Sequence, residues 1–534
     1  MKCSTIANTC LAAAYGLSTL DYFNTMKINK LLIANRGEIA LRVMRTAREM
    51  GISTVAVYSE ADRLAPHVRY ADEAVCLGPP PSNQSYLLGK KIIEESLRLG
   101  VDAIHPGYGF LSENAVFAKA VSEAGIIFVG PGTHAIEVMG SKLAAKDAVK
   151  DYDIPMVPGI DRAVTDAKEA QEIAAKIGFP ILIKASAGGG GKGMRIVENS
   201  EELPEQMQRA VSEATSAFGD GSVFVEKYIT SPRHIEIQVL ADNHGNVVHL
   251  FERECSIQRR HQKVVEEAPS VILTPELRAR MGKSAADVAR ACGYSGAGTV
   301  EFLVDANLDY YFLEMNTRLQ VEHPVTELIT GIDLVRQQIL VAQNEPLAFT
   351  QDDLKIEGHA LELRVYAEDP NNNFLPSVGK LQTYRPPRGH GVRVDDGFEE
   401  GMDIPIYYDP MISKLVTYGE NREEAISRMQ RAIRDYEITG VETTLPFGQF
   451  VMQHEAFVSG KFDTHFVKNY FVTQTFLSGE GEDNQTEMSG LCEEEAKVAA
   501  LLATQILNQA KPINSKADSA QSKVSKWKRR NTIF

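Results

Sequence analysis

Apolar and polar positions alternate along the chain in patterns that predict strands and helices in turn. Residues 28–34 (INKLLIA) form an apolar run with the length of a buried strand. After NRGE, apolar residues recur every three to four positions over 39–50, which predicts a helix that ends at Gly51. STVAVYS at 53–59 predicts the next strand. Strand, helix and strand at this spacing indicate a βαβ unit and hence a parallel sheet.

The same alternation continues for about eighty further residues. DAIHPGYGF at 102–110 and GIIFVGP at 125–131 both have the pattern of short buried strands. We therefore predict that residues 26–140 form an open, parallel α/β domain.

Beyond residue 140 the strands change character. A helix-rich stretch leads at about residue 178 into the strand FPILIKAS and then into the glycine run AGGGGKGM. Later segments, among them HIEIQVLAD, GTVEFLVD and YYFLEMN, alternate apolar and polar positions, which predicts antiparallel strands buried on one side. Strand signals dominate again from 358 to about 420, and 422–437 (REEAISRMQRAIRDYE) predicts a helix. The fold class is thus mixed α/β and α+β, with predicted domains at 26–140, 141–357 and 358–472.

The composition excludes several classes of function. The 534 residues carry a net charge of −15, so the chain lacks the broad basic surface that non-specific nucleic-acid binding needs. Six scattered cysteines without a CxxC pair indicate neither a zinc site nor a redox motif, and they fit a reducing compartment such as the cytoplasm. No apolar run approaches the roughly 20 residues of a membrane span.

The two ends of the chain differ from the rest. Residues 1–25 are mildly apolar with one lysine, and we expect a disordered extension before a folded protein that begins at Met26. A weak signal peptide is the alternative. Residues 473–534 comprise a polar linker, a predicted helix at 493–509 and a basic, disordered end. That helix is either a contact with another subunit or an ordinary terminal helix.

The glycine run at 188–191, followed by Lys192, is the first candidate for chemistry. Glycines expose backbone N–H groups and permit positive φ, so such a loop can close over phosphates. Its spacing matches neither a P-loop nor a dinucleotide-binding fingerprint. Lys184 stands just before the loop, where it could bind phosphate oxygens. The alternatives are a flexible linker and a plain surface lysine.

Carboxylates on two neighbouring predicted strands are the second candidate. Glu301 lies in GTVEFLVD and Glu314 in YYFLEMN, with Asn316 two residues on. Their oxygens suit Mg²⁺ (or Mn²⁺) that also binds nucleotide phosphates. If the second strand stays extended, Arg318 and Gln320 share the side of Glu314. A solvated charged face is disfavoured, because an unpaired charge within an apolar strand is costly.

Two dense polar segments complete the candidates. NTRLQVEHPVTE at 316–327 contains few apolar residues directly after a buried strand, which indicates a site more often than a core. RECSIQRRHQKVVEEAP at 253–269 offers basic residues that could hold a small oxyanion, although a surface charge run is equally consistent with it.

The motifs NRGEIALR, HPGYGFLSEN, KASAGGGGKGM, ERECSIQRRHQKVVEEAP and EMNTRLQVEHPVTE occur in this order. With them the chain closely resembles biotin carboxylases from about residue 28 to 470. The resemblance implies an ATP-grasp fold with an N-terminal α/β domain, a mobile glycine-rich lid at about 156–228 and a mainly β C-terminal domain. It also implies carboxylation of biotin from ATP and bicarbonate by way of carboxyphosphate.

Residue roles follow from the resemblance where the motifs match. The implied ATP-binding residues are Lys142, Lys184, Gly190, Gly191, Glu226, Lys227, Tyr228, Ile229, His234, Gln258 and His261. The implied metal ligands are Glu301, Glu314 and Asn316, and the implied bicarbonate and biotin pocket is Lys263, Arg318, Gln320, Val321 and Arg364. The implied catalytic residues are Lys263, Arg318, the general base Glu322 and Arg364, which faces biotin. Ser141 departs from the acidic residue that the family usually has there.

The resemblance further implies a homodimer whose partners are a biotin carboxyl carrier protein and carboxyltransferase subunits, without nucleic acid or membrane. The sequence has no M-K-M biotinylation motif and no carboxyltransferase-sized segment after residue 470, so we expect the biotin on a separate carrier. The final acceptor stays open among acetyl-CoA (fatty acid biosynthesis), propionyl-CoA and pyruvate. The alternatives are another ATP-grasp ligase of the carbamoyl-phosphate synthetase type and a non-catalytic scaffold protein of a carboxylase complex.

Overall fold

The computed structural model describes residues 27–471, with gaps at 161, 163, 165, 186–193, 219–220, 222 and 260–261. The expected extension 1–25 and the tail 473–534, with its predicted helix, lie outside the described residues.

The N-terminal part contains a five-stranded sheet in the order β3-β2-β1-β4-β5, all pairs parallel, as the sequence predicts. Helix α3 (Gly37–Glu49) packs Ile39 and Val43 against one face, while α5 (Gly89–Leu99) and α6 (Ala115–Glu123) cover the other. The strands are β1 (Lys30–Ile33), β2 (Ser53–Ser59), β3 (Glu73–Gly78), β4 (Ala103–His105) and β5 (Ile127–Phe128).

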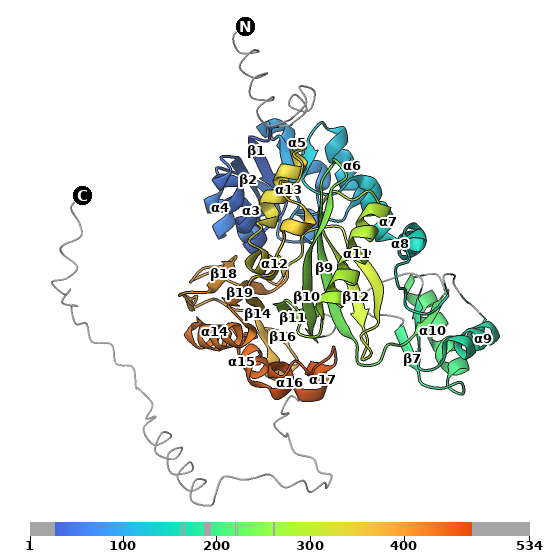
Figure 1. Ribbon diagram of the computed structural model, residues 1–534. Coiled ribbons are helices and arrows are strands. Elements are labelled where there is room, and N and C mark those ends of the chain that lie inside the picture. Colours follow the sequence, from blue (N-terminus) through green and yellow to red (C-terminus); the bar gives the residue numbers. More distant parts are fainter. Residues whose placement is uncertain are drawn as a thin grey trace, which may run out of the picture. The chain divides into compact units, whose positions relative to one another are not determined.

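A small antiparallel sheet follows, with β6 between β7 and β8. Helices α9 (Ala167–Ile177) and α10 (Leu203–Phe218) bury its apolar side chains in a core of their own. Figure 1 shows these elements in green beside the larger body. The strands are β6 (Ile181–Ala185), β7 (Met194–Val197) and β8 (Val223–Lys227).

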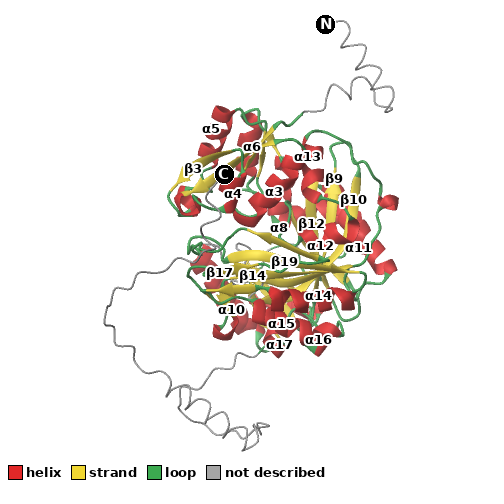
Figure 2. Ribbon diagram, turned by 90° about the vertical axis from the view of Figure 1, so that its left-hand side faces the viewer, coloured by secondary structure: helices red, strands yellow, loops and turns green. Residues whose placement is uncertain are grey.

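The largest sheet has eight strands in the order β13-β12-β9-β10-β11-β14-β19-β18, all pairs antiparallel. The pairing of β11 with β14 carries this one sheet across the predicted domain boundary at 357/358. Figure 2 shows its strands in yellow with red helices around them. The strands are β9 (Arg233–Ala241), β10 (Val247–Arg259), β11 (Gln262–Ala268), β12 (Gly296–Val304), β13 (Tyr310–Asn316), β14 (His359–Tyr366), β18 (Val392–Asp396) and β19 (Met411–Gly419).

Strand β9 corrects one prediction. Its alternating pattern suggested a strand with one solvated face, yet all nine of its residues are buried. Ile235, Ile237 and Val239 pack in the core that α11 (Pro275–Ala291) closes. The polar residues between them, including Glu236 and Gln238, form buried hydrogen bonds on the other face. That face is covered by polar groups rather than water, which the alternation alone does not distinguish.

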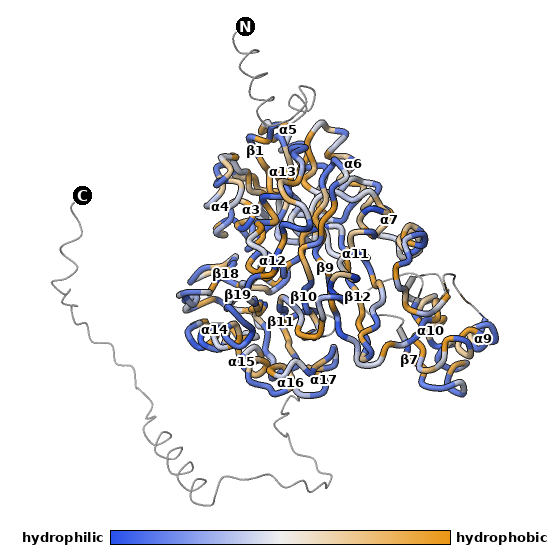
Figure 3. Tube along the Cα trace, viewed as in Figure 1, coloured by the Kyte–Doolittle hydropathy of each residue, from blue (hydrophilic) through white to orange (hydrophobic). Residues whose placement is uncertain are grey.

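Two more helices matter for the site and its support. Helix α12 (His323–Thr330) lies across β11, β14 and β19, and α14 (Arg422–Asp435) matches the helix predicted at 422–437. Figure 3 shows β1 largely in the orange of hydrophobic residues, whereas α9 and α14 carry stretches in the blue of hydrophilic residues. None of the helices among the described residues is long and apolar enough to cross a membrane. The remaining elements are α4 (Pro66–Tyr70), α7 (Thr133–Gly140), α8 (Lys142–Val149), α13 (Leu334–Ala342), α15 (Leu445–Gln453), α16 (Glu455–Val458), α17 (Phe466–Tyr470), β15 (Glu368–Asp369), β16 (Leu375–Pro376), β17 (Thr383–Arg385) and β20 (Glu437–Thr439).

Candidate functional site

Lys263 of β11 lies at the centre of the predicted site. Its Nζ donates to Glu236 of β9 at 2.5 Å, to Glu301 of β12 at 2.9 Å and to Glu322, the N-cap of α12, at 2.8 Å. Burial alone would lower the pKa of Lys263, but these three carboxylates raise it well above its ordinary value. An ammonium that is charged at neutral pH is thus held among three acidic groups.

Glu322 is shared between two cations. Its Oε1 accepts from Lys263, and its Oε2 accepts from the Arg364 guanidinium at 2.9 Å. Burial would raise the pKa of Glu322, yet Lys263 and Arg364 hold it well below the usual range. The carboxyl is therefore ionised at neutral pH and able to accept a proton.

The three predicted metal ligands lie together. Glu301 and Glu314 are directly opposite on β12 and β13. Asn316 donates through Nδ2 to Glu301 Oε1 at 2.9 Å, and Gln320 donates to the same oxygen at 2.9 Å. Like charges opposite each other on neighbouring strands repel, which a divalent cation between them would offset. The donor set therefore fits Mg²⁺ or Mn²⁺.

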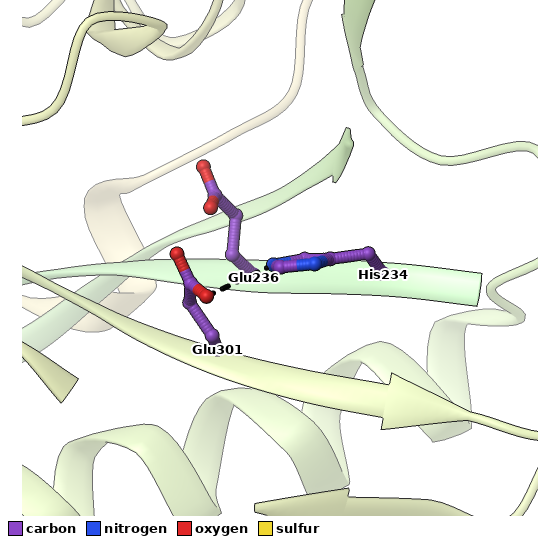
Figure 4. Close-up of side chains that lie close together, drawn as sticks. All are labelled: His234, Glu236 and Glu301. Atoms are coloured by element: carbon purple, nitrogen blue, oxygen red, sulfur yellow. Dashed lines mark ion pairs between the residues drawn. The ribbon is translucent and has the colours of Figure 1, made fainter. Parts of the chain in front are cut away.

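His234 adds a nitrogen on the edge of this group. Its Nε2 lies 3.1 Å from Glu301 Oε2, an ion-pair distance without hydrogen-bond alignment. Figure 4 shows the two side chains directed toward each other, with Glu236 beside them. Ligand atoms of His234, Glu236 and Glu301 all lie within 4.8 Å of one another, and Gln258 contacts His234 Nδ1 at 3.0 Å.

Arg318 extends from the loop after β13. Its Nε donates to Glu113 at 2.9 Å and one NH2 donates to Asn316 Oδ1 at 3.0 Å. Strand β13 ends at Asn316. The chain is therefore not extended as far as Arg318 and Gln320, which was the condition for placing them on the same side as Glu314. Even so, Arg318, Val321 and Arg364 line one cavity, between the NRGE segment that begins α3 and the ends of β14 and β19.

A second cavity contains the predicted phosphate lysine. Lys184 and Lys146 both donate to Glu226, at 2.5 Å and 3.1 Å, and the three line this cavity with Glu314. Burial would raise the pKa of Glu226, but the two lysines lower it. The carboxylate holds two ammonium groups at a cavity that also reaches a candidate metal ligand.

The segment after Glu226 joins the small sheet to the rest. The Lys227 backbone N–H donates to Pro158 at 2.7 Å, and its Nζ donates to the carbonyls of Gly178 and Phe179. Tyr228 contacts His465 at 3.5 Å, and Ile229 is buried. The backbone N–H of Lys227 is therefore already paired within the protein.

Four predicted residues lie partly or wholly outside the described part of the chain. Gly190, Gly191 and His261 are not among the described residues. Lys142 opens α8 after its N-cap Ser141, but its side chain is outside the described part.

Sequence reasoning missed four residues of the site. Arg253, fully buried, donates to Glu236 at 2.5 Å and to Gln320 at 2.7 Å. Glu236 is itself shared with Lys263. The alternation of polar residues in HIEIQVLAD could have indicated Glu236. Lys146 follows Lys142 by four residues, so in a helix the two lysines lie on the same face, and this spacing could have indicated Lys146. Glu113 lies in the motif HPGYGFLSEN and Arg253 in ERECSIQRRHQKVVEEAP, but no feature within these motifs singled out either residue.

Three family models match consecutive parts of the chain. Residues 27–136 match "Biotin carboxylase, N-terminal domain", 141–350 match "Carbamoyl-phosphate synthase L chain, ATP binding domain", and 362–469 match "Biotin carboxylase C-terminal domain". The cluster around Lys263 draws on the second and third of these segments.

Curated relatives are similar over most of the chain. A pyruvate carboxylase subunit of Methanothermobacter thermautotrophicus is 55% identical over 442 residues, which cover 83% of this chain and 90% of the relative. Biotin carboxylase 1 of Bacillus subtilis is 53% identical over 446 residues, with coverages of 83% and 99%. The mouse mitochondrial propionyl-CoA carboxylase alpha chain is 54% identical over 465 residues, but only 64% of its length is covered.

Solved structures agree with these relatives. A Campylobacter jejuni biotin carboxylase complex has a TM-score of 0.79 at 47% identity, with 83% of this chain and 99% of that chain covered. The biotin carboxylase domain of Hydrogenobacter thermophilus 2-oxoglutarate carboxylase, solved with MgADP, ADP and bicarbonate, has a TM-score of 0.77 at 48% identity, with coverages of 83% and 97%.

Proposed function

This chain belongs to the biotin carboxylase family, and we propose that it uses ATP and bicarbonate to carboxylate biotin presented by a carrier protein. The observation that carries the proposal is the buried chain Lys263–Glu322–Arg364, with Glu322 bonded to both cations. Lys263 bonds the candidate metal ligand Glu301, and Arg364 lines the cavity that also contains Arg318 and Val321. One ionised carboxylate therefore connects the two halves of the reaction.

In the first step, bicarbonate would bind to Lys263, Arg318, Gln320 and the backbone of Val321. Bicarbonate is a weak nucleophile, and Glu322 would take its proton as an oxygen attacks the γ-phosphate of ATP. When Lys263 bonds bicarbonate instead of Glu322, it no longer stabilises the ionised form of Glu322. The pKa of Glu322 then rises, which makes Glu322 a better base. Holding the anion in place replaces a chance collision by a positioned attack. The products are carboxyphosphate and ADP.

The nucleotide would lie beside Glu226, with its phosphates on Lys184 and Lys142 under the loop of Gly190 and Gly191. Tyr228, Ile229, His234, Gln258 and His261 would line the rest of the site. Glu301, Glu314 and Asn316 would hold Mg²⁺ or Mn²⁺, which when bound neutralises charge on the phosphates. Glu226 keeps Lys184 and Lys146 at the cavity before the nucleotide arrives.

In the second step, carboxyphosphate would break down to CO₂ and phosphate. The ureido nitrogen of biotin loses its proton to that phosphate and attacks CO₂. Arg364 would stabilise the oxyanion that forms on the ureido group. Its place in the cavity with Arg318 and Val321 supports this role.

The proposal is tested by measuring ADP release with and without bicarbonate and free biotin, and with ammonia as a competing acceptor. Biotin carboxylase activity requires both bicarbonate and biotin, whereas a carbamoyl-phosphate synthetase type of ligase would respond to ammonia. A scaffold would release no ADP at all. We expect Arg318→Ala and Glu322→Ala to bind ATP but to lose biotin-dependent ATP cleavage; wild-type turnover in either would refute their roles.

The subunits and domains that complete this activity are also proposed. We propose a homodimer that works with a carrier protein and carboxyltransferase subunits, and domains at 26–140, 141–357 (lid about 156–228) and 358–472. The pyruvate and propionyl-CoA carboxylase chains among the relatives support either acceptor, and acetyl-CoA stays a third. A streptavidin blot of the pure chain should be blank if biotin resides on another polypeptide. Copurifying proteins and acyl-CoA assays would identify the acceptor.

A further inference from the structure

Two buried glutamates lie behind Arg364. Glu266 of β11 and Glu362 of β14 are directly opposite in the sheet, and both are fully buried. Glu362 is two residues before Arg364, so both side chains leave β14 on the same face. Apolar residues of α12 close that face against β11, β14 and β19. The two carboxyl groups therefore share one buried site between sheet and helix.

The hydrogen bonds of this site are unequal. Arg364 donates through Nε to Glu266 Oε1 at 2.6 Å and through NH2 to Glu322 at 2.9 Å. Glu266 Oε2 and both oxygens of Glu362 are buried and have no hydrogen-bond partner within the described residues. An ionised carboxylate in such a place is costly, whereas a protonated one can donate to its neighbour. Because Arg364 donates to Glu266 and stabilises its ionised form, we infer that Glu362 is the protonated member of the pair.

The surrounding charges favour the same assignment. The groups that face Glu362 are Glu266 from β11, Glu322 at the start of α12, Arg364 on its own strand and Lys414 of β19. Helix α14 lies on the opposite face, where it packs with the apolar residues that alternate with Glu362. Lys414 donates to the Val321 carbonyl at 3.0 Å and pairs with Glu38 and Asp395.

Protonation follows from this environment. Burial raises the pKa of Glu266 to about 7, and burial raises that of Glu362 well above its ordinary value. Two carboxyl groups in one buried site bind a first proton tightly, because both cannot be ionised together at low cost.

We propose that Glu362 works as a protonated carboxylic acid that donates a hydrogen bond to Glu266, and that Glu266 in turn holds the Arg364 guanidinium in position for biotin. The proton gives Glu362 a role as a donor and satisfies Glu266 Oε2. Glu266 and Glu362 are thus positioning residues, since neither lines the cavity with Arg364. The inference rests on the proposed function for the ligand of Arg364, but the shared proton does not depend on it.

The test compares Glu362→Gln, Glu266→Gln and the control Glu267→Gln. Glutamine mimics the protonated acid, so we expect Glu362→Gln to keep the wild-type KM for biotin below the pH at which the pair loses its proton. Above that pH, kcat/KM for biotin should decline in the wild type relative to Glu362→Gln, because only the wild type can lose this proton. Glu266→Gln should lower kcat/KM for biotin by roughly tenfold or more, the scale of one charge-assisted hydrogen bond, with little change in KM for ATP.

The control removes a buried glutamate without touching Arg364. Glu267 bonds His359 and Arg422 on the other face of β11, so Glu267→Gln should lower the melting temperature and leave biotin kinetics and their pH profile unchanged. A rate ratio of wild type to Glu362→Gln that stays constant with pH would overturn the proposal. So would wild-type biotin kinetics in Glu266→Gln.

A measurement without turnover separates this inference from the proposed function. Infrared difference spectra of the wild type minus Glu362→Gln at neutral pH should contain the carbonyl band of a protonated carboxylic acid. Absence of that band refutes the shared proton even in an active enzyme. If the wild type cleaves no ATP with bicarbonate, the proposed function fails, and the band still decides on the pair.

Discussion

Replacement of Arg253 by methionine is the strongest test of how the site is held together. The guanidinium is fully buried and donates five hydrogen bonds, which join β9, β10, β12 and α12. Arg253→Met keeps much of the apolar volume but removes all five donors. Of the two cations that Glu236 bonds among the described residues, Lys263 alone then remains.

The size of the effect follows from that geometry. Removing one partner of a buried ion pair costs about 3–5 kcal/mol, because the remaining charge is left uncompensated. Four neutral acceptors also lose a donor at about 0.5–1.5 kcal/mol each, although such losses do not add within one network. We therefore expect a loss of about 3–5 kcal/mol in the free energy of unfolding.

The assay is denaturant unfolding of the wild type, Arg253→Met, Glu236→Gln and the double variant. Glu236→Gln removes the uncompensated charge, so the double variant should lose clearly less than the sum of the single variants. Arg98→Met is the matched control, because its ion pair with Glu95 is exposed and should contribute little. A loss under about 1 kcal/mol in Arg253→Met, or strict additivity with Glu236→Gln, would refute the reasoning.

Three further predictions concern the nucleotide, the acid limit and the metal. Lys184→Met should raise KM for ATP by about tenfold or more, measured by ADP release, because it removes a charged donor that Glu226 keeps at the cavity; an unchanged KM contradicts the assignment. Burial alone would raise the pKa of Glu267, but its bonds with His359 and Arg422 lower the pKa to about 2. The resulting stabilisation of about 3 kcal/mol is present above about pH 4.5 and is lost as pH falls toward 2. The melting-temperature difference between wild type and Glu267→Gln should shrink over that range, and a constant difference would contradict it. Chelation of Mg²⁺ should abolish ADP release, and Glu301→Gln or Glu314→Gln should require more metal for half-maximal rate; an unshifted metal requirement would exclude them as ligands.

Local sequence determined much of this protein. Side-chain period predicted the helix at 422–437, because burial on one side of a helix repeats every 3.6 residues. The order strand, helix, strand predicted the parallel N-terminal sheet. The place of Glu301 and Glu314 on neighbouring predicted strands indicated that they lie near each other, and they are directly opposite on β12 and β13. Lys184 was indicated because a lysine at the end of a strand beside a glycine run is well placed to bind phosphate oxygens, and it does lie at a cavity.

Tertiary structure decided what these local patterns could not. Whether the polar face of β9 meets water or other polar groups depends on β10, β12 and α12, which are distant in sequence. Arg253 has the same local context as any basic residue, and only the closed sheet makes it the centre of five hydrogen bonds. Likewise Glu266 and Glu362 are 96 positions apart by their numbers, and the register of β11 with β14 alone brings them together. Burial and pairing of charges are properties of the assembled sheet, so their chemistry is determined there rather than in any one segment.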